Sequence, residues 1–244
     1  MKKNKFGIGI VLYDGEELLE QCLKFIRPHV DYINIVYSVT SYTGKQGNPE
    51  LTSIVEKMKK KFSIDEVIEY KNIPNKTRSE QEKLKRMVSL NMAKKAKINY
   101  FMFLDSDEFY DDSTIETAKQ LIVKNKITHS YVHILNYGTE PTQRYDKRKW
   151  EYYVPFFSKI NNFSICGNNK KAPCLCDPTR QILGIYLKQK HYVLENIFMH
   201  HMTRVRKNIM LKYTSRNVNP NIDSDWINDK DGFLTVPNYF DIHI

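Results

Sequence analysis

Three carboxylates stand close together in the chain: Asp105, Asp107 and Glu108 directly follow the apolar run 101–104. Such a run is typical of a buried strand, and two carboxylates one residue apart at its end cannot both enter the core without a compensating cation. Mg²⁺ and Mn²⁺ prefer oxygen ligands and often bridge one or two carboxylates and a diphosphate. We therefore expect Asp105 and Asp107 to be catalytic and to bind Mn²⁺ or Mg²⁺. The alternative is a solvated acidic turn that caps the next helix.

Two adjacent histidines, His200 and His201, end an apolar stretch far along the chain from the acidic residues. Successive side chains of a strand point to opposite faces, so we expect one imidazole to be exposed or to bind a ligand. A neutral imidazole suits Mn²⁺, and His201 is our candidate for a third metal ligand. The alternative is a histidine packed at the end of a strand.

Basic side chains before and after these motifs are candidates for binding a diphosphate, because guanidinium and ammonium groups pair with phosphate oxygens. For any one of them a solvated surface position is an equally good explanation. Taken together they favour a phosphate site, and they are Arg86, Arg204, Arg206 and Lys212.

Residues at the ends of the first two apolar runs are expected to contact the rest of a bound nucleotide. Leu12 and Tyr13 close the run 6–13, and Ser38 follows the run 32–37. Ligands of open α/β sheets bind at the carboxyl ends of the strands, where we also place Ser106. Ordinary packing at the sheet edge is the alternative for Tyr13.

A second substrate is expected to lie beside the aromatic run 150–157, because aromatic faces stack on sugars. Tyr153 lies in this run, and Glu108 follows the apolar run 101–104 and the two aspartates. Both are candidates for contact with an acceptor. Core packing explains the aromatic run equally well. A further acidic cluster within 223–231 follows no apolar run and indicates a solvated loop.

The elements that must position these residues follow from hydrophobic periodicity. Strand patterns at 6–13, 32–37, 66–70 and 100–104 alternate with helical patterns at 16–27, 51–62 and 77–97. Such alternation predicts a doubly wound, mostly parallel sheet with helices on both faces. A helix is expected at 113–124, and strands at 130–137, 152–158, 181–187 and 191–201. We read 1–244 as one domain, with a nucleotide-binding half at 1–112 and an acceptor-binding, site-closing half at 113–244.

Composition and charge exclude several classes of protein. The chain has 244 residues, 41% hydrophobic and 12% aromatic, which excludes a disordered or collagen-like protein. Its formal net charge of +10 suggests an anionic partner, such as a phosphate ligand or an acidic membrane surface. The cysteines Cys22, Cys166, Cys174 and Cys176 lack zinc-site spacing and favour free thiols. We expect a cytoplasmic protein, with peripheral contact to an anionic membrane and no nucleic-acid partner.

These motifs together resemble the GT-A glycosyltransferases of the family-2-like group. The resemblance rests on three features. The first is a helical motif that starts with Lys85 and Arg86, and the second is the apolar strand before the D-x-D at 105–107. The third is a late His-x-x-x-x-Arg at 201–206. The spacing of the last motif selects His201 and Arg206. The stretch 177–180 also looks similar to the group, and from it we place Asp177 and Arg180 beside the acceptor. Met87 departs from the pattern, which has Asn there.

The resemblance implies a GT-A fold and a metal-dependent transfer of a sugar from a nucleotide-diphosphate donor, a UDP-sugar above all, to a glycan or lipid-linked acceptor. Two alternatives come from other classes. A haloacid-dehalogenase-like phosphatase also places Asp-x-Asp after an apolar strand, but it requires Thr or Val where this chain has Glu108. A basic nucleic-acid-binding protein would fit the charge, although the sequence holds no nucleic-acid-binding motif.

Overall fold

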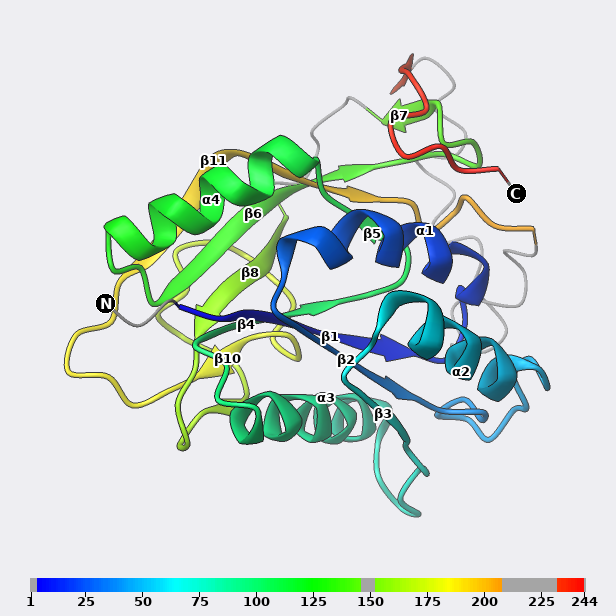
Figure 1. Cartoon of the computed structure of the whole chain (residues 1–244), viewed down its shortest axis with the longest axis horizontal. Coiled ribbons are helices and arrows are strands. Elements are labelled where there is room, and N and C mark those ends of the chain that lie inside the picture. Colours follow the sequence, from blue (N-terminus) through cyan, green and yellow to red (C-terminus); the bar gives the residue numbers. More distant parts are fainter. Residues whose placement is uncertain (1–3, 146–151, 208–231, 244) are drawn as a thin grey trace.

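An eight-stranded sheet forms the centre of the molecule (Figure 1). The computed structural model describes residues 4–145, 152–207 and 232–243. The strand order is β3-β2-β1-β4-β8-β6-β11-β5. These strands are β1 (Phe6–Leu12), β2 (Tyr32–Tyr37), β3 (Glu66–Glu69), β4 (Tyr100–Leu104), β5 (Glu108–Phe109), β6 (His129–Asn136), β8 (Tyr153–Lys159) and β11 (His191–His201).

The two halves of the chain contribute differently to this sheet. Strands β1 to β4 are parallel to one another, as right-handed β-α-β crossovers require. Strand β8 runs antiparallel to both β4 and β6, β11 runs parallel to β6, and β5 runs antiparallel to β11. The expected α/β class, with a Rossmann-like parallel half and a mixed second half, is confirmed.

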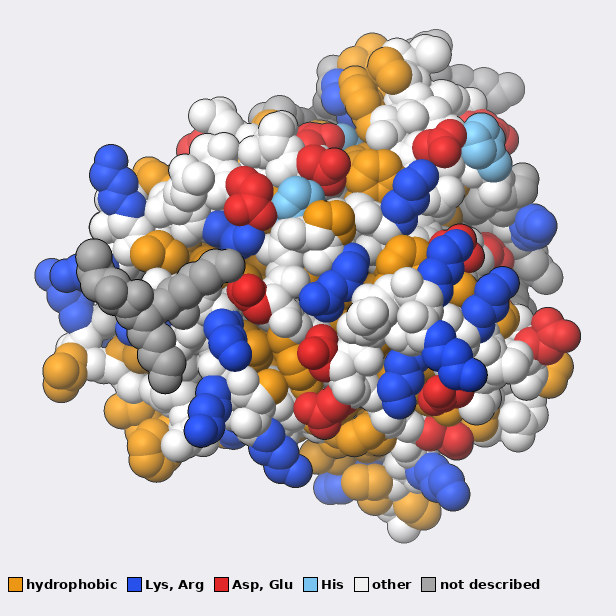
Figure 2. Space-filling view, viewed as in Figure 1, with side chains coloured by type: hydrophobic (Ala, Val, Ile, Leu, Met, Phe, Trp, Pro, Cys, Tyr) orange, Lys and Arg blue, Asp and Glu red, His pale blue; other side chains and the backbone are white. Residues whose placement is uncertain are grey.

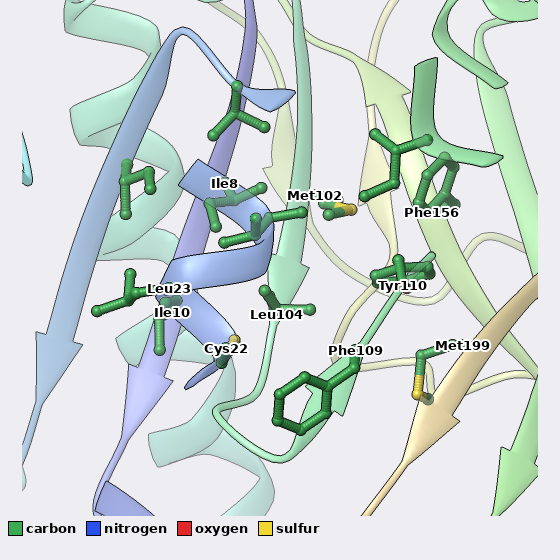
Figure 3. Packing of buried hydrophobic residues seen from close by; sticks show 14 of the residues in the cluster. Ile8, Ile10, Cys22, Leu23, Met102, Leu104, Phe109, Tyr110, Phe156 and Met199 are labelled. Atoms are coloured by element: carbon green, nitrogen blue, oxygen red, sulfur yellow. The ribbon is translucent and has the colours of Figure 1, made fainter. Parts of the chain in front are cut away.

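Helices cover both faces because the strand side chains alternate between two apolar clusters. Met102 and Leu104 of β4 face the cluster that contains the buried residues of three helices, whereas Phe101 and Phe103 face the opposite side. Figure 3 shows Met102 and Leu104 beside Cys22 and the other residues of the first cluster. The three helices are α1 (Glu16–Ile26), α2 (Leu51–Phe62) and α4 (Asp112–Lys124), a 3₁₀ turn η1 (Arg27–His29) follows α1, and α3 (Arg78–Lys95) covers the other face.

Helix α3 lies unusually close to β1. A Cβ added at Gly9 would stand 1.9 Å from the Ser89 hydroxyl, so only glycine permits this approach. Ser89 donates to Asn34 Oδ1 at 2.6 Å, and Asn34 Nδ2 returns a bond to the Ser89 carbonyl at 3.0 Å. The helix begins at a capping box in which Thr77 and Glu80 bond to each other's backbone N–H. The helix that carries Lys85 and Arg86 is therefore fixed at its start and in its middle.

The later elements differ in part from the sequence-based expectation. The expected strand at 181–187 is wrong beyond its first residues: β10 (Ile182–Leu183) pairs only with β9 (Ile165–Cys166), outside the main sheet. Residues 184–190 form no strand; the Tyr186 hydroxyl bonds to the Lys159 carbonyl at the end of β8, and the Lys190 N–H donates to the Thr128 hydroxyl. A second ribbon pairs β7 (Gln143–Tyr145) with β12 (Phe233–Thr235). All four cysteines are free, as expected. Lys212 and the acidic cluster within 223–231 lie outside the described residues.

No helix in the described part of the chain is long and apolar enough to cross a bilayer.

Two histidines stack where β6, β8 and β11 meet, and His129 is the buried one. The rings of His129 and His191 stack with centroids 4.6 Å apart, and His129 Nδ1 lies 3.3 Å from the Ser158 hydroxyl. Burial, and then the neighbouring His191, lower the pKa of His129 to about 4. The folded protein therefore holds His129 neutral at pH values at which the unfolded chain binds a proton.

From the lowered pKa of His129 we expect the protein to lose stability in mild acid. Because the unfolded state takes up the proton near the ordinary pKa of 6.5, the free energy of unfolding falls as the pH drops below it. We expect His129 to account for a loss of about 2 kcal/mol between pH 7 and pH 5. Urea unfolding at the two pH values measures it. His129→Gln should reduce the loss, whereas His243→Gln, at an exposed position, should not; equal losses in both variants would contradict this assignment.

Candidate active site

A pocket lies at the carboxyl ends of β1, β2 and β4. We call it the first pocket. It brings together every described residue that was predicted to contact the donor, Arg204 aside, along with both aspartates of the D-x-D. Its lining is Val11, Leu12, Tyr13, Asp14, Ser38, Thr40, Ser41, Tyr42, Arg78, Glu82, Lys85, Arg86, Asp105, Ser106, Asp107 and Arg206.

The first pocket contains as many acidic as basic side chains. Its carboxylates are Asp14, Glu82, Asp105 and Asp107, and its cations are Arg78, Lys85, Arg86 and Arg206. A diphosphate that entered it would add negative charge without a matching cation. The Nε of Arg86 and the Oδ2 of Asp14 are buried and have no hydrogen-bond partner within the described residues. The hydrogen-bonding capacity of these two atoms is therefore not used by the described residues.

Arg206 connects the second half of the chain to the D-x-D. Its Nη2 lies 2.5 Å from Asp107 Oδ2, and its Nη1 lies 3.6 Å from Asp14 Oδ1. The backbone N–H of Met202 donates to the Asp107 carbonyl at 2.8 Å. Gly15 has a φ of 81°, and a Cβ there would meet the Arg206 guanidinium at 2.8 Å. Met202 and Arg206 therefore lie directly against the acidic turn.

Glu108 and Arg180 form a buried pair beneath that turn. Arg180 Nη2 donates to Glu108 Oε2 at 2.6 Å, its Nη1 bonds to Oε1, and Nη2 also bonds to the Phe103 carbonyl at 2.8 Å. The N–H of Asp105 donates to Glu108 Oε2 at 3.0 Å. The pair thus joins the end of β4 to the turn and determines where Asp105 projects.

A second pocket opens on the other side of Asp105. It is lined by all four residues that were predicted to contact the acceptor, Glu108, Tyr153, Asp177 and Arg180, and also by Arg78, Glu82, Arg86, Asp105, Ile134, Asn136, Tyr152, Val154, Met199 and His201. The side chains of Glu108 and Arg180 are almost fully buried and bond to each other, so their clearest role is to shape this pocket. Contact with an acceptor stays a prediction for all four.

Asp105 lies between the two pockets. Its Oδ1 is 3.7 Å from Arg86 Nη2, its Oδ2 is 3.8 Å from Arg180 Nη1, and about a third of the side chain is exposed. It is the acidic residue of the D-x-D that lines both pockets. Arg78, Glu82 and Arg86 also line both pockets, so the two pockets share one wall.

The two late histidines have different environments. His200 is buried, with Nδ1 2.7 Å from the Tyr137 hydroxyl and Nε2 3.5 Å from Asp111 Oδ2. His201 lines the second pocket, with Nδ1 3.1 Å from Asn136 Oδ1. Asn136 thus orients the imidazole of His201 at the wall of this pocket. The structure thus separates a packed histidine from one that faces a pocket.

The predicted metal ligands come together only in pairs. Asp105 shares the first pocket with Asp107 and the second with His201. Within the described residues, no group of three His, Cys, Asp or Glu side chains is arranged to hold a metal ion. A metal role for these three residues stays a prediction.

Sequence reasoning did not place Lys85, Asp14 or Asn136 in the site. Lys85 Nζ donates to the Leu12 carbonyl at 2.6 Å, and burial, followed by the charge of Arg86, lowers its pKa to about 7. The buried residues of α3 include Gln81, Lys85 and Ser89 at intervals of four. The sequence signal for this buried polar face was a stripe of polar residues at helical spacing, where a buried helix face usually carries apolar residues.

Comparisons with known proteins give limited information. No family model and no curated protein matches the sequence. Among solved structures, S. aureus TarS 1–349 matches with a TM-score of 0.40 and 19% identity over 54% of this chain, and its complex with UDP matches equally. Its complex with UDP-GlcNAc matches with a TM-score of 0.41 and 17% identity over 54% of this chain. The chain spans only 36% and 35% of these chains, and at such scores the likeness supports no statement about function.

Removal of one partner of the buried Glu108–Arg180 pair should strongly reduce the stability of the fold. Arg180→Met leaves Glu108 buried without its cation, and we expect a loss of about 3–5 kcal/mol in the free energy of unfolding at neutral pH. Protonation of Glu108 relieves the penalty, so the loss should shrink at low pH. Denaturant unfolding of Arg180→Met and of the double variant Arg180→Met/Glu108→Gln measures both effects.

The control for this prediction is Arg27→Met, which removes a more exposed pair with Asp65 at 3.6 Å and should cost less than about 1 kcal/mol. A similar small loss in Arg180→Met, or no recovery in the double variant, would show that the turn does not depend on this pair.

Proposed function

We propose that this chain is a cytoplasmic glycosyltransferase that moves a sugar from a nucleotide-diphosphate donor, a UDP-sugar, to a glycan or lipid-linked acceptor. The observation that carries the proposal is that two pockets meet at Asp105, at the carboxyl ends of the parallel strands. Transfer between two substrates needs two neighbouring sites that share a reaction centre, whereas a hydrolase needs one.

The donor is assigned to the first pocket. Tyr13 and Ser38 stand at the ends of β1 and β2 and line the pocket, and the ring of Tyr13 suits stacking on a nucleobase. Arg86 and Arg206 lie farther in, beside the two aspartates, and present guanidinium groups that bind phosphate oxygens in pairs. The diphosphate therefore lies next to Asp105 and Asp107, and the sugar points toward the second pocket.

A divalent cation, Mn²⁺ or Mg²⁺, fits the residues present if it binds together with the donor. Asp105 and Asp107 supply two carboxylates in one pocket, and the diphosphate supplies further oxygens, which is how Mg²⁺ is often held. The balanced charge of the pocket also calls for added positive charge when a diphosphate enters. Such an ion stabilises the negative charge that develops on the leaving phosphate. His201 is the candidate for one more ligand, through Nε2.

The chain's own residues prepare this reaction in three ways. Arg86 and Arg206 offset charge on the departing nucleotide, and both are already fixed by contacts to carboxylates. Glu108 and Arg180 hold the turn so that Asp105 faces both pockets. Tyr153 and Asp177 provide an aromatic face and a carboxylate in the second pocket, which suit a sugar acceptor.

Asp107→Asn and Asp105→Asn test the donor site. Each should reduce Mn²⁺-dependent UDP binding, followed by calorimetry, by at least about 10-fold, and abolish Mn²⁺-dependent hydrolysis of a UDP-sugar. The exposed control Asp112→Asn should behave like the wild type. Normal turnover by Asp107→Asn with Mn²⁺ would refute the site, and hydrolysis of simple phosphate esters would instead support the phosphatase alternative.

His201→Ala tests the contribution of the second half to the same site. Loss of the Nε2 ligand should weaken Mn²⁺-dependent UDP-sugar binding about 10-fold or more, while UDP binding in EDTA stays unchanged. His243→Ala, on the exposed C-terminal segment, serves as control. Unchanged Mn²⁺ and donor affinities in His201→Ala would assign His201 to the acceptor pocket alone.

A further inference from the structure

Three large apolar side chains stand in solvent at the edge of the sheet where β4 begins. Phe163, Ile185 and Leu187 are 71%, 74% and 111% exposed, respectively. Single exposed apolar residues are common on proteins, but a contiguous apolar group is typical of an interaction surface. Phe163 and Ile185 line one shallow groove with Lys94 and Lys97, so at least these two residues of the group lie together.

The turn that carries Phe163 is held in place by polar bonds. The N–H of Phe163 donates to Asn161 Oδ1 at 3.0 Å, and the N–H of Ser164 donates to the Asn161 carbonyl at 3.0 Å. Lys94 Nζ bonds to the Ser164 carbonyl at 3.0 Å and ties the turn to the end of α3. The exposed ring is therefore presented by an ordered turn.

The segment with Ile185 and Leu187 is anchored in the same way. The hydroxyl of Tyr186 bonds to the Lys159 carbonyl, and Asn161 Nδ2 donates to the Ile185 carbonyl at 2.9 Å. Tyr186 is thus anchored through its hydroxyl, whereas Ile185 and Leu187 on either side of it are exposed. Hydrogen bonds thus hold both loops in conformations that keep apolar side chains exposed to water.

The segments that carry these side chains are basic, and the described lining of the groove contains two lysines and no carboxylate. The segments 94–99, 159–171 and 182–190 contain eight lysines and no Asp or Glu. Figure 2 shows blue and orange side chains at the left edge of the molecule, over the loops that Figure 1 draws in yellow. Lysines at the end of α3 also complement the helix dipole, but that role does not account for exposed Phe, Ile and Leu.

We propose that this surface docks onto an anionic phospholipid bilayer. We call it the exposed patch and define it by Phe163, Ile185, Leu187, Lys97 and Lys188. Apolar side chains that enter the headgroup region, ringed by lysines that meet anionic lipid, are the two elements of peripheral membrane binding. A second copy of the chain fits poorly, because it would bring lysines against lysines.

The position of the exposed patch makes the proposal independent of the proposed function. Strand β4 begins beside Asn99 in the patch groove and ends at Leu104, directly before Asp105. Five residues of strand separate the two edges by about 17 Å. A docked molecule therefore turns its two pockets away from the lipid, and docking should leave donor binding unchanged.

Vesicle co-sedimentation at low salt tests the proposal. The wild-type chain should bind vesicles of phosphatidylcholine mixed with phosphatidylglycerol, should not bind phosphatidylcholine alone, and should dissociate as salt rises. The triple change Phe163→Ser, Ile185→Ser and Leu187→Ser should weaken binding at least about 10-fold. Each of Lys97→Gln and Lys188→Gln should weaken it about fivefold.

Matched controls lie on helix α2, whose exposed Lys57 and Lys60 face elsewhere. Lys57→Gln/Lys60→Gln should bind vesicles as the wild type does, and all variants should bind UDP equally. On vesicle addition, hydrogen exchange should slow in 161–165 and 184–188. Equal binding by the triple variant overturns the proposal, as does a dimer in sedimentation velocity that this variant abolishes.

Discussion

The arrangement of the site depends on one buried ion pair, Arg180 with Glu108. A carboxylate at the end of a buried strand is costly to desolvate, and here a guanidinium from a loop far along the chain compensates it. Once the pair has formed, Glu108 accepts the N–H of Asp105 and so defines the acidic turn. The same guanidinium bonds to the Phe103 carbonyl, which ties the turn to β4.

Charge compensation extends outward from this pair. Asp105 lies between the guanidinium groups of Arg86 and Arg180, and Asp107 pairs with Arg206. Three arginines from three distant segments thus meet around one short turn. The three guanidinium groups and Asp107 are nearly buried, and the low local dielectric strengthens their interactions. These contacts add to the pairing of β4 with β8, which joins the two halves of the chain in one sheet.

The elements that carry the site were predictable because each has a local signal. The apolar run of β4 ends where charged residues begin, and the capping box at Thr77 and Glu80 starts α3. The expected strand at 181–187 was wrong beyond its first residues, because Tyr186 bonds through its hydroxyl to Lys159 at the end of β8 and leaves Ile185 and Leu187 in solvent. Apolar alternation alone does not say which partner an extended segment finds.

By itself, the sequence determined the α/β alternation, the acidic turn at the end of a strand and the presence of late histidine and arginine residues. These depend on periodicity and residue type within a few positions of each other. Only the tertiary structure decided that His200 packs against Tyr137, that Glu108 supports the turn from below, and that the buried Lys85 lines the first pocket. The physical reason is that burial and pairing of charges depend on partners far away in the chain, and only the folded chain brings them together.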